Sequence, residues 1–214
     1  SCKDLFFPDR YYVSLLSLKE IKKLKKNSRA SLAENFYLDT LLYDQNACTS
    51  PHLVIWVGSN NNVKISKKIF WSNLHIIVKN KYQVQSVSAI DKITTFYSQS
   101  IEMKNISLQD NSDNLMWRIN LSELTNNIDQ FRSNSGYFSE YHAQSLNEIS
   151  KIINNRYQTL SYYGFQKKEL TRVINEIKPY GIDRIVPIGK TTDFSLLWDG
   201  YNIIDSLTRK VEIL

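Results

Sequence analysis

The sequence predicts an α/β protein of three layers, in which helices cover both faces of a mostly parallel sheet. The first observation is the continuously apolar run at 53–57, which is typical of a central strand covered on both faces. The second is the alternation of strand-like and helix-like segments from Tyr137 onward. The third is size and composition. A chain of 214 residues, 42% hydrophobic and 22% charged, can form one domain with a substantial core.

The N-terminal half is expected to contain a strand, two helices, a second strand and a third helix. Ser28 is expected to cap the second helix, and Pro51 disfavours helical geometry just before it, so that helix should stop ahead of the loop that follows. A turn is expected at 59–62. The expected ranges of the five elements are 11–17, 19–26, 29–43, 53–57 and 64–79.

The C-terminal half is predicted to continue with a helix at 90–97 and a strand at 116–121. Strands and helices then alternate, which predicts parallel strands with right-handed crossovers. A helix at 196–204 and a strand at 210–214 should close the chain, because Val211 and Ile213 alternate with charged residues. That last strand would add stability or make a subunit contact. The alternating elements are expected at 137–142, 146–154, 159–163, 168–177 and 184–186.

The chain is basic, with a net charge of +6 and a pI near 9.1. Its densest lysine run, at 19–26, favours a solvated helix face over a phosphate site, and no nucleic-acid-binding motif accompanies it. No apolar run approaches the roughly 18 residues of a membrane span. The two cysteines, Cys2 and Cys48, make a poor disulfide framework, which predicts a reducing, cytoplasmic location.

Metal and nucleotide motifs are missing from the sequence. His52, His75 and His142 lie far apart and none has a second ligand at zinc-like spacing. Six scattered glycines form neither a dinucleotide-binding fingerprint nor a P-loop. We therefore expect no metal site, and no main phosphate cradle for a nucleotide within these residues.

Cys48 is the candidate catalytic residue. Its thiol lies among small and amide residues at an expected helix-to-strand junction, where amide, hydroxyl and backbone N–H groups can stabilise a thiolate or an oxyanion. Cys48 should then alkylate faster than a model thiol. The residues expected to support the loop are Gln45, Asn46, Thr49 and Ser50.

Two alternatives for Cys48 stay open. Most lone cysteines are buried and structural, and Cys48 fits that class as well. It could also pair with His142 as a cysteine hydrolase does, although a histidine at a strand end is more often structural.

Four stretches of the chain carry a family resemblance: 44–51 (DQNACTSP), 157–164, 181–190 and 198–209. At these residues the chain resembles the long-chain fatty acid reductases of bacterial luminescence systems, which reduce acyl-CoA and acyl-protein thioesters and are related to the aldehyde dehydrogenase superfamily. The stretches occur in the family's order and are spread over nearly the whole chain. The segment 44–51 looks like the family's active-site cysteine segment.

The resemblance implies that an acyl group is transferred to Cys48 and reduced to a fatty aldehyde by NADPH. It implies a long-chain acyl-CoA or an acylated protein, delivered by an acyl-protein synthetase, as partner, and a homo-oligomer. Members carry an N-terminal nucleotide-binding half and a C-terminal half with the cysteine. Residues 1–214 are thus expected to be a single catalytic domain, with the nucleotide-binding half outside this chain.

Two departures from the related enzymes matter. Aldehyde-oxidising relatives use a glutamate to activate water, and the corresponding segment here, 13–17, has no acid, which fits a reductase. The glutamate that holds the nicotinamide ribose has no counterpart near 134–137, so no residue is assigned to the cofactor. Two other functions remain as alternatives: a non-catalytic scaffold domain that uses the basic face at 19–26, and a cysteine-dependent thioester hydrolase.

Overall fold

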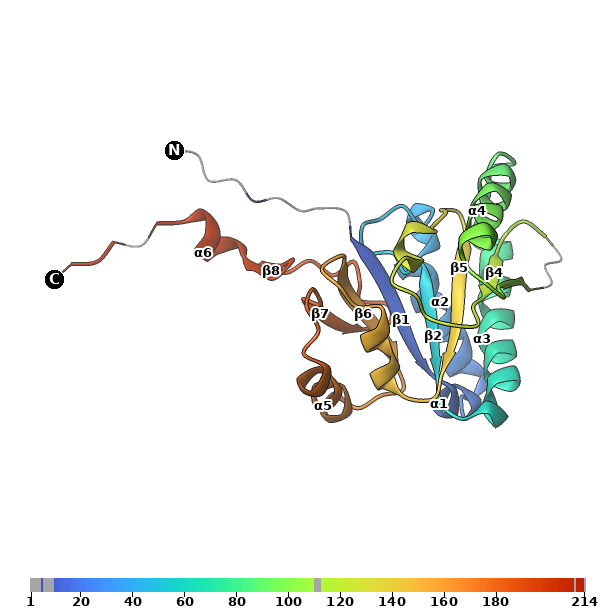
Figure 1. The fold of residues 1–214 in the computed structure, drawn as a ribbon, viewed down its shortest axis with the longest axis horizontal. Helices are drawn as coiled ribbons and strands as arrows, with labels where there is room; N and C mark the ends of the chain where they lie inside the picture. The colour runs from blue at the N-terminus through green and yellow to red at the C-terminus, as the bar shows by residue number, and fades with distance from the viewer. Residues whose placement is uncertain (1–4, 6–9, 110–112, 210, 214) are drawn as a thin grey trace.

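The computed structural model describes residues 5, 10–109, 113–209 and 211–213, so Cys2 lies outside the described residues. Within them, a sheet of seven strands has the order β3-β4-β5-β2-β1-β6-β7 (Figure 1). Every neighbouring pair from β4 to β7 is parallel, and β3 is antiparallel to β4. The strands are β1 Tyr11–Ser17, β2 Leu53–Val57, β3 Ser107–Leu108, β4 Trp117–Asn120, β5 Tyr137–Ala143, β6 Tyr157–Tyr163 and β7 Arg184–Pro187.

Helices cover both faces of this sheet, as predicted. One face packs against α1, α2 and α3, and the opposite face packs against η2, η3, α5 and part of α4. None of the helices in the described part of the chain has both the length and the apolarity of a membrane span. The helices are α1 Leu18–Lys22, α2 Lys26–Asp39, η1 Leu41–Tyr43, α3 Asn60–Lys81, α4 Ser88–Glu102, η2 Ile128–Gln130, η3 Leu146–Lys151, α5 Lys167–Ile177 and α6 Ile203–Leu207.

Strands β1 and β2 form the centre of the sheet, and every residue of both is buried. Their side chains alternate between the two cores. Leu53 and Ile55 of β2 pack into one core, while Val54 and Trp56 pack into the other. The apolar run at 53–57 therefore reflects burial on both faces of a parallel sheet.

Several element boundaries differ from the sequence predictions. Helix α2 begins at Lys26 with Lys25 at its N-cap, so Ser28 lies inside the helix and does not cap it. Residues 60–62, expected as a turn, form the first turn of α3. The segment expected as a helix at 146–154 is the shorter 3₁₀ helix η3. Strands β5 and β6 are parallel, but β2 and β1 lie between them.

The C-terminal segment corrects two predictions. The expected helix at 196–204 begins as a hairpin of β8 Leu197–Trp198 and β9 Tyr201–Asn202, because Asp199 and Gly200 both adopt positive φ, as hairpin turns require. The strand expected at 210–214 lies partly outside the described residues. Val211 and Ile213 are 87% and 91% exposed and belong to no strand, so the expected buried face is wrong. Two alternating apolar residues cannot form a strand without a neighbouring strand to pair with.

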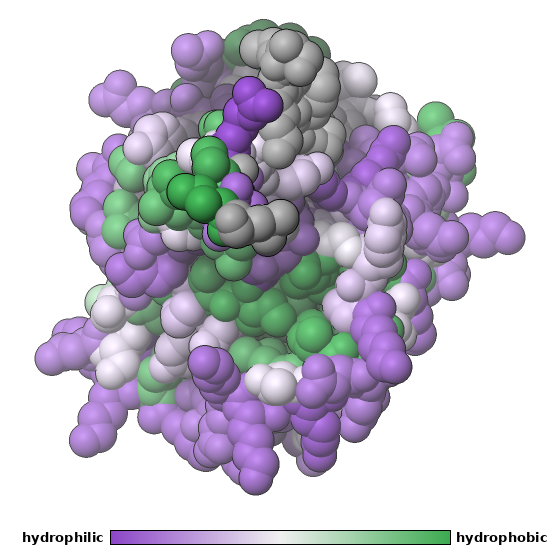
Figure 2. Space-filling view, turned by 90° about the vertical axis from the view of Figure 1, so that its left-hand side faces the viewer, coloured by the Kyte–Doolittle hydropathy of each residue, from purple (hydrophilic) through white to green (hydrophobic). Residues whose placement is uncertain are grey.

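In Figure 1, α6 projects away from the sheet. Figure 2 looks along this projection and shows an apolar area, framed by hydrophilic side chains, at the end of the molecule that carries β7. Strand β7 is an edge of the sheet, and Arg184, Ile185 and Val186 in it are only half-buried.

Candidate active site at the Cys48 loop

The loop that carries Cys48 begins with a sharp change of chain direction after η1. Asp44 and Gln45 have φ angles of 54° and 62°, so two consecutive residues are left-handed. The Gln45 N–H donates to the Thr40 carbonyl (2.9 Å), and the Asn46 N–H donates to the Tyr43 carbonyl (2.8 Å). These bonds end the helical segment and direct the chain into the loop ahead of β2.

The side-chain amide of Gln45 connects this loop to the start of β5. Its Nε2 donates to the carbonyls of Pro51 (2.9 Å) and Tyr137 (3.0 Å). Its Oε1 accepts from the N–H groups of Gly136 (3.0 Å) and Tyr137 (3.1 Å). Gln45 is 1% exposed, so a buried amide with all its main hydrogen-bonding positions satisfied holds the Cys48 loop in place.

Two further bonds join the same two segments. The Ser135 N–H donates to the Asp44 carbonyl (2.8 Å), and Asn134 Nδ2 donates to Asn46 Oδ1 (3.1 Å). The loop before β2 and the loop before β5 therefore form one unit at the amino ends of two neighbouring parallel strands.

Cys48 lies at the surface of this unit as an exposed free thiol. It borders a pocket of about 510 Å³. The pocket brings together four of the five residues expected at the site, Gln45, Asn46, Cys48 and Ser50. Thr49 is buried beneath the loop and does not line the pocket. Cys48 is therefore not a buried structural cysteine.

The backbone around Cys48 offers hydrogen-bond donors. Within the described residues, the N–H groups of Ala47, Cys48 and Thr49 donate to no acceptor, whereas the Ser50 N–H donates to the Ala47 carbonyl (2.9 Å). Successive unpaired N–H groups can bind an anion that develops next to them. The loop thus combines an exposed thiol with unpaired backbone donors.

Sequence reasoning missed most of the other pocket residues. Three lining segments directly precede strands β1, β2 and β5. Their amino ends lie together because these strands are parallel neighbours in the folded sheet, an order that the sequence did not reveal. The α4 residues are spaced by three and four, but nothing in the sequence related that helix face to Cys48. The missed residues are Arg10, His52, Asp91, Thr94, Thr95, Arg132, Ser133 and Asn134.

His52 is fixed in the wall of the pocket. It is 8% exposed, its ring stacks on Tyr11 with centroids 5.8 Å apart, and its Nδ1 has no hydrogen-bond partner within the described residues. Burial lowers the pKa of His52 to about 4, and the backbone of Ser133 opposes this only in part. His52 is therefore neutral near pH 7.

Other groups near Cys48 set the electrostatics. Two arginines line the pocket, and Arg132 Nη1 donates to the Arg10 carbonyl (3.2 Å). Burial, and then the charge of Arg156, lower the pKa of Arg132. Asp91 is the one carboxylate among the lining residues of the described chain. Burial raises the pKa of Tyr12 well above its usual range, and a negative charge on Cys48 raises it further.

His142 does not meet Cys48. Its Nε2 pairs with the Gly58 carbonyl (2.6 Å), and it lies beside Trp56 near the carboxyl end of β2, whereas Cys48 precedes the amino end of that strand. The Cys48–His142 pair considered from the sequence is therefore wrong, and the histidine in the pocket is His52.

Metal-ligating side chains and glycine-rich turns are the two features by which the described residues could hold a metal or a nucleotide. No three His, Cys, Asp or Glu side chains among them gather as a metal site requires. Gly58 and Gly164 lie in the turns that lead into α3 and α5, but neither belongs to a glycine-rich phosphate-binding motif.

Comparison with known proteins places the chain in context. The model of the family described as "Acyl-CoA reductase (LuxC)" matches residues 13–210. Searching the curated proteins gave no match. Among solved structures, 1-pyrroline-5-carboxylate dehydrogenase of Thermus thermophilus has a TM-score of 0.55 at 9% identity, over 89% of this chain and 37% of that one.

Succinic semialdehyde dehydrogenase of Streptococcus pyogenes, in complex with NADP+, has a TM-score of 0.54 at 11% identity, over 85% of this chain and 40% of that one. At such identities the likeness shows the fold alone. The fold is that of aldehyde dehydrogenases, and the chain spans well under half the length of these neighbours.

Proposed function

Because the chain belongs to the LuxC family of acyl-CoA reductases, we propose that it is the cysteine-bearing domain of an enzyme that reduces acyl thioesters to aldehydes. The observation that carries the proposal is the exposed Cys48 thiol, set beside unpaired backbone N–H groups in a loop that Gln45 clamps to β5. The aldehyde-dehydrogenase-like fold supports the same class of reaction.

The step that these residues support is acyl transfer. Cys48 Sγ bonds to the carbonyl carbon of the thioester, the C–S bond to the carrier breaks, and the proton of the Cys48 thiol ends on the departing carrier thiol. We propose that the unpaired N–H groups of Ala47 and Cys48, which both line the pocket, donate to the oxygen that becomes negative in the tetrahedral state. Exchange of one thioester for another requires no activated water, which agrees with the absence of an acid in β1.

The finer proposals concern substrate and cofactor. Apart from Ala47, the pocket lining within the described chain is polar, so a long acyl chain would continue over a neighbouring surface. Helix α4 offers one: Ile90, Tyr97 and Ile101 are 63%, 59% and 83% exposed, and Thr94 of the same helix lines the pocket. We propose NADPH as hydride donor, with its phosphates bound mainly by residues outside this chain.

Partners and assembly belong to the same proposal. The acyl donor is a long-chain acyl-CoA or an acylated protein delivered by an acyl-protein synthetase, and the reaction takes place in the cytoplasm. The projecting C-terminal segment, with Leu196, Ile204 and Leu207 more than half exposed, supports a homo-oligomer in which a second subunit covers these side chains.

The test is acylation at a defined atom. The protein is incubated with tetradecanoyl-CoA and analysed by intact mass, then by peptide mapping. We expect one tetradecanoyl group on Cys48 and none on the Cys48→Ala variant, in which Cys2 serves as an internal control thiol. Equal acylation of the wild type and Cys48→Ala would refute the nucleophile.

One observation keeps a second function in consideration. Asp91 and the neutral His52 both line the pocket, and either could direct water at an acyl-cysteine. A thioester hydrolase would release free tetradecanoic acid from the acylated protein without a reductant. A stable acyl-protein, with no fatty acid released over several hours, would exclude that function and support the reductase.

A further inference from the structure

A second pocket lies between α3 and β4, the strand next to the edge strand β3. Its volume is about 550 Å³, a size typical of small-molecule sites, and no residue lines both it and the Cys48 pocket. Four of its lining side chains are cationic, and the carboxylate among them, Asp113, already pairs with His75 (2.7 Å). The cationic residues are Lys64, Lys67, Lys68 and Arg118.

A buried carboxylate holds two of these cations in place. Glu140 of β5 is 0% exposed and accepts from the indole N–H groups of Trp56 (2.7 Å) and Trp71 (3.0 Å). Lys67 Nζ lies 3.1 Å from Glu140 Oε2, and Arg118 Nη1 lies 4.0 Å from Oε1. The side chains of Lys67 and Arg118 are 15% and 22% exposed, so both charges are held at the pocket wall before any ligand arrives.

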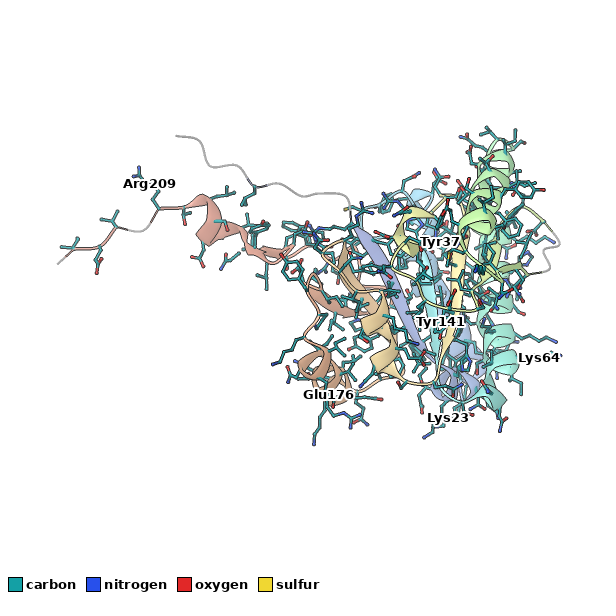
Figure 3. All side chains as sticks on the ribbon, in the orientation of Figure 1. Lys23, Tyr37, Lys64, Tyr141, Glu176 and Arg209 are labelled. Atoms are coloured by element: carbon teal, nitrogen blue, oxygen red, sulfur yellow. The ribbon has the colours of Figure 1, made fainter. Side chains whose placement is uncertain are left out.

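The cations are left with unused hydrogen-bonding capacity. Arg118 stacks on the Trp71 ring (5.5 Å), yet no oxygen of the described chain accepts a hydrogen bond from its guanidinium. Lys64 and Lys68 are exposed and have no carboxylate partner among the described residues, and Figure 3 shows Lys64 on the outer side of α3. A half-buried guanidinium without an acceptor needs an anion or water to satisfy it.

We propose that the pocket between α3 and β4 binds an organic phosphate. A phosphate group can accept hydrogen bonds from the coplanar N–H groups of the Arg118 guanidinium. Lys64, Lys67 and Lys68 then neutralise the charge of the phosphate. Trp71, Ile76 and Met116 supply an apolar wall for the remainder of the ligand. The site is separate from the Cys48 chemistry, so it stands or fails independently of the proposed reductase function. The phosphate can belong to a nucleotide or to a phosphopantetheine carrier.

The experiment is isothermal titration calorimetry of the full chain with five probes: pyrophosphate, ADP, 3′-phospho-ADP, CoA and phosphate-free pantetheine. We expect pyrophosphate, ADP, 3′-phospho-ADP and CoA to bind and pantetheine not to bind. CoA contains an ADP group with an added 3′-phosphate. Affinity for ADP equal to or above that for CoA therefore assigns a nucleotide, whereas CoA binding more tightly than both ADP and 3′-phospho-ADP assigns a phosphopantetheine carrier. Pantetheine binding as tightly as CoA would overturn the proposal.

Matched double variants separate a site from general surface charge. Lys64→Gln with Lys68→Gln removes two exposed charges at the pocket. Lys167→Gln with Lys168→Gln removes two exposed charges from α5 and is the control. We expect the first pair to weaken ADP or CoA binding roughly tenfold and the second to change it less than about twofold. Equal losses in the two variants would show diffuse binding and refute the site.

Arg118→Lys provides a third variant that keeps a positive charge beside Glu140 and so preserves the fold. It should weaken phosphate binding while leaving the melting temperature of the free protein unchanged, because the planar donor fork is lost and the charge is kept. Unchanged affinity in this variant would contradict the role assigned to the guanidinium.

Discussion

Replacing Gln45 by alanine tests the clamp between the Cys48 loop and β5. The substitution removes four buried hydrogen bonds of 2.9 to 3.1 Å, to groups of Pro51, Gly136 and Tyr137. A hydrogen bond contributes about 1 kcal/mol net, and a buried polar group left unpaired costs about 1–3 kcal/mol. Water entering from the adjacent pocket would satisfy some of these groups. We therefore expect the free energy of unfolding to fall by about 3 kcal/mol.

For a chain of this size, that loss corresponds to a decrease of about 6–12 °C in melting temperature. The assay is urea unfolding followed by far-ultraviolet circular dichroism, with Gln85→Ala as the control because the Gln85 side chain is exposed. Alkylation of Cys48 is measured in parallel under native conditions. A change in unfolding free energy below about 0.5 kcal/mol for Gln45→Ala would refute the clamp.

Gln45→Glu adds a pH-dependent version of the same test. In the variant, a carboxyl oxygen takes the place of Nε2. It faces the carbonyl oxygens of Pro51 and Tyr137, which in the wild type accept hydrogen bonds from Gln45 Nε2. The protonated acid can still donate, so the folded-state pKa of this glutamate should be raised above its unfolded value. Stability relative to the wild type is then greatest below about pH 4.3 and is lost as pH rises through the folded-state pKa. Equal losses at pH 4 and pH 7 would contradict the assigned donor.

Three further predictions follow from single features. His52 has a pKa of about 4 when folded against an ordinary value of 6.5, so its contribution to stability is lost as pH falls from 6.5 to 4. His52→Gln should remove up to about 3 kcal/mol of that pH dependence, measured as the wild-type-minus-variant difference in unfolding free energy at pH 4.5 and 7.5. Deleting residues 211–214 should leave the melting temperature within about 1 °C, because Val211 and Ile213 are almost fully exposed, and a larger fall would show that the segment packs. Gly136→Ala should cost more than about 2 kcal/mol in thermal unfolding, because φ is +93° and a Cβ would collide with the Leu115 carbonyl oxygen; a smaller cost would mean that this turn relaxes freely.

The central sheet could be predicted because its strands are simple in composition. The run at 53–57 is apolar throughout because β2 is buried on both faces, and β1, β5, β6 and β7 appear close to their expected bounds. Strand order could not be predicted, because β2 and β1 separate β5 from β6 and local sequence carries no record of such insertion. The Asp199–Gly200 hairpin carried a recognisable turn pair, but the apolar residues around it favoured a helix.

Helix α4 shows why amphipathic patterns can mislead. Its buried side chains include Lys92 and Gln99, which bond to the Asn114 carbonyl (2.5 Å) and to Ser139 Oγ (3.2 Å). Its apolar residues Ile90 and Ile101 point to solvent. A pattern-based prediction would place this helix with the opposite face inward. The polar face is stable inside because each buried group finds a partner there.

The position of the Cys48 pocket also departs from the usual rule for open α/β sheets, in which ligands bind beyond the carboxyl ends of the strands. Here the lining segments precede β1, β2 and β5, so the pocket lies at their amino ends. Such a site has no helix N-terminus following a strand to organise it, and its loops must be joined by side chains. Gln45 and Asn46 make these connections to the segment before β5. The sequence could therefore indicate the thiol and its amide neighbours, whereas the opposite wall of the pocket depended on a strand pairing that only the folded sheet reveals.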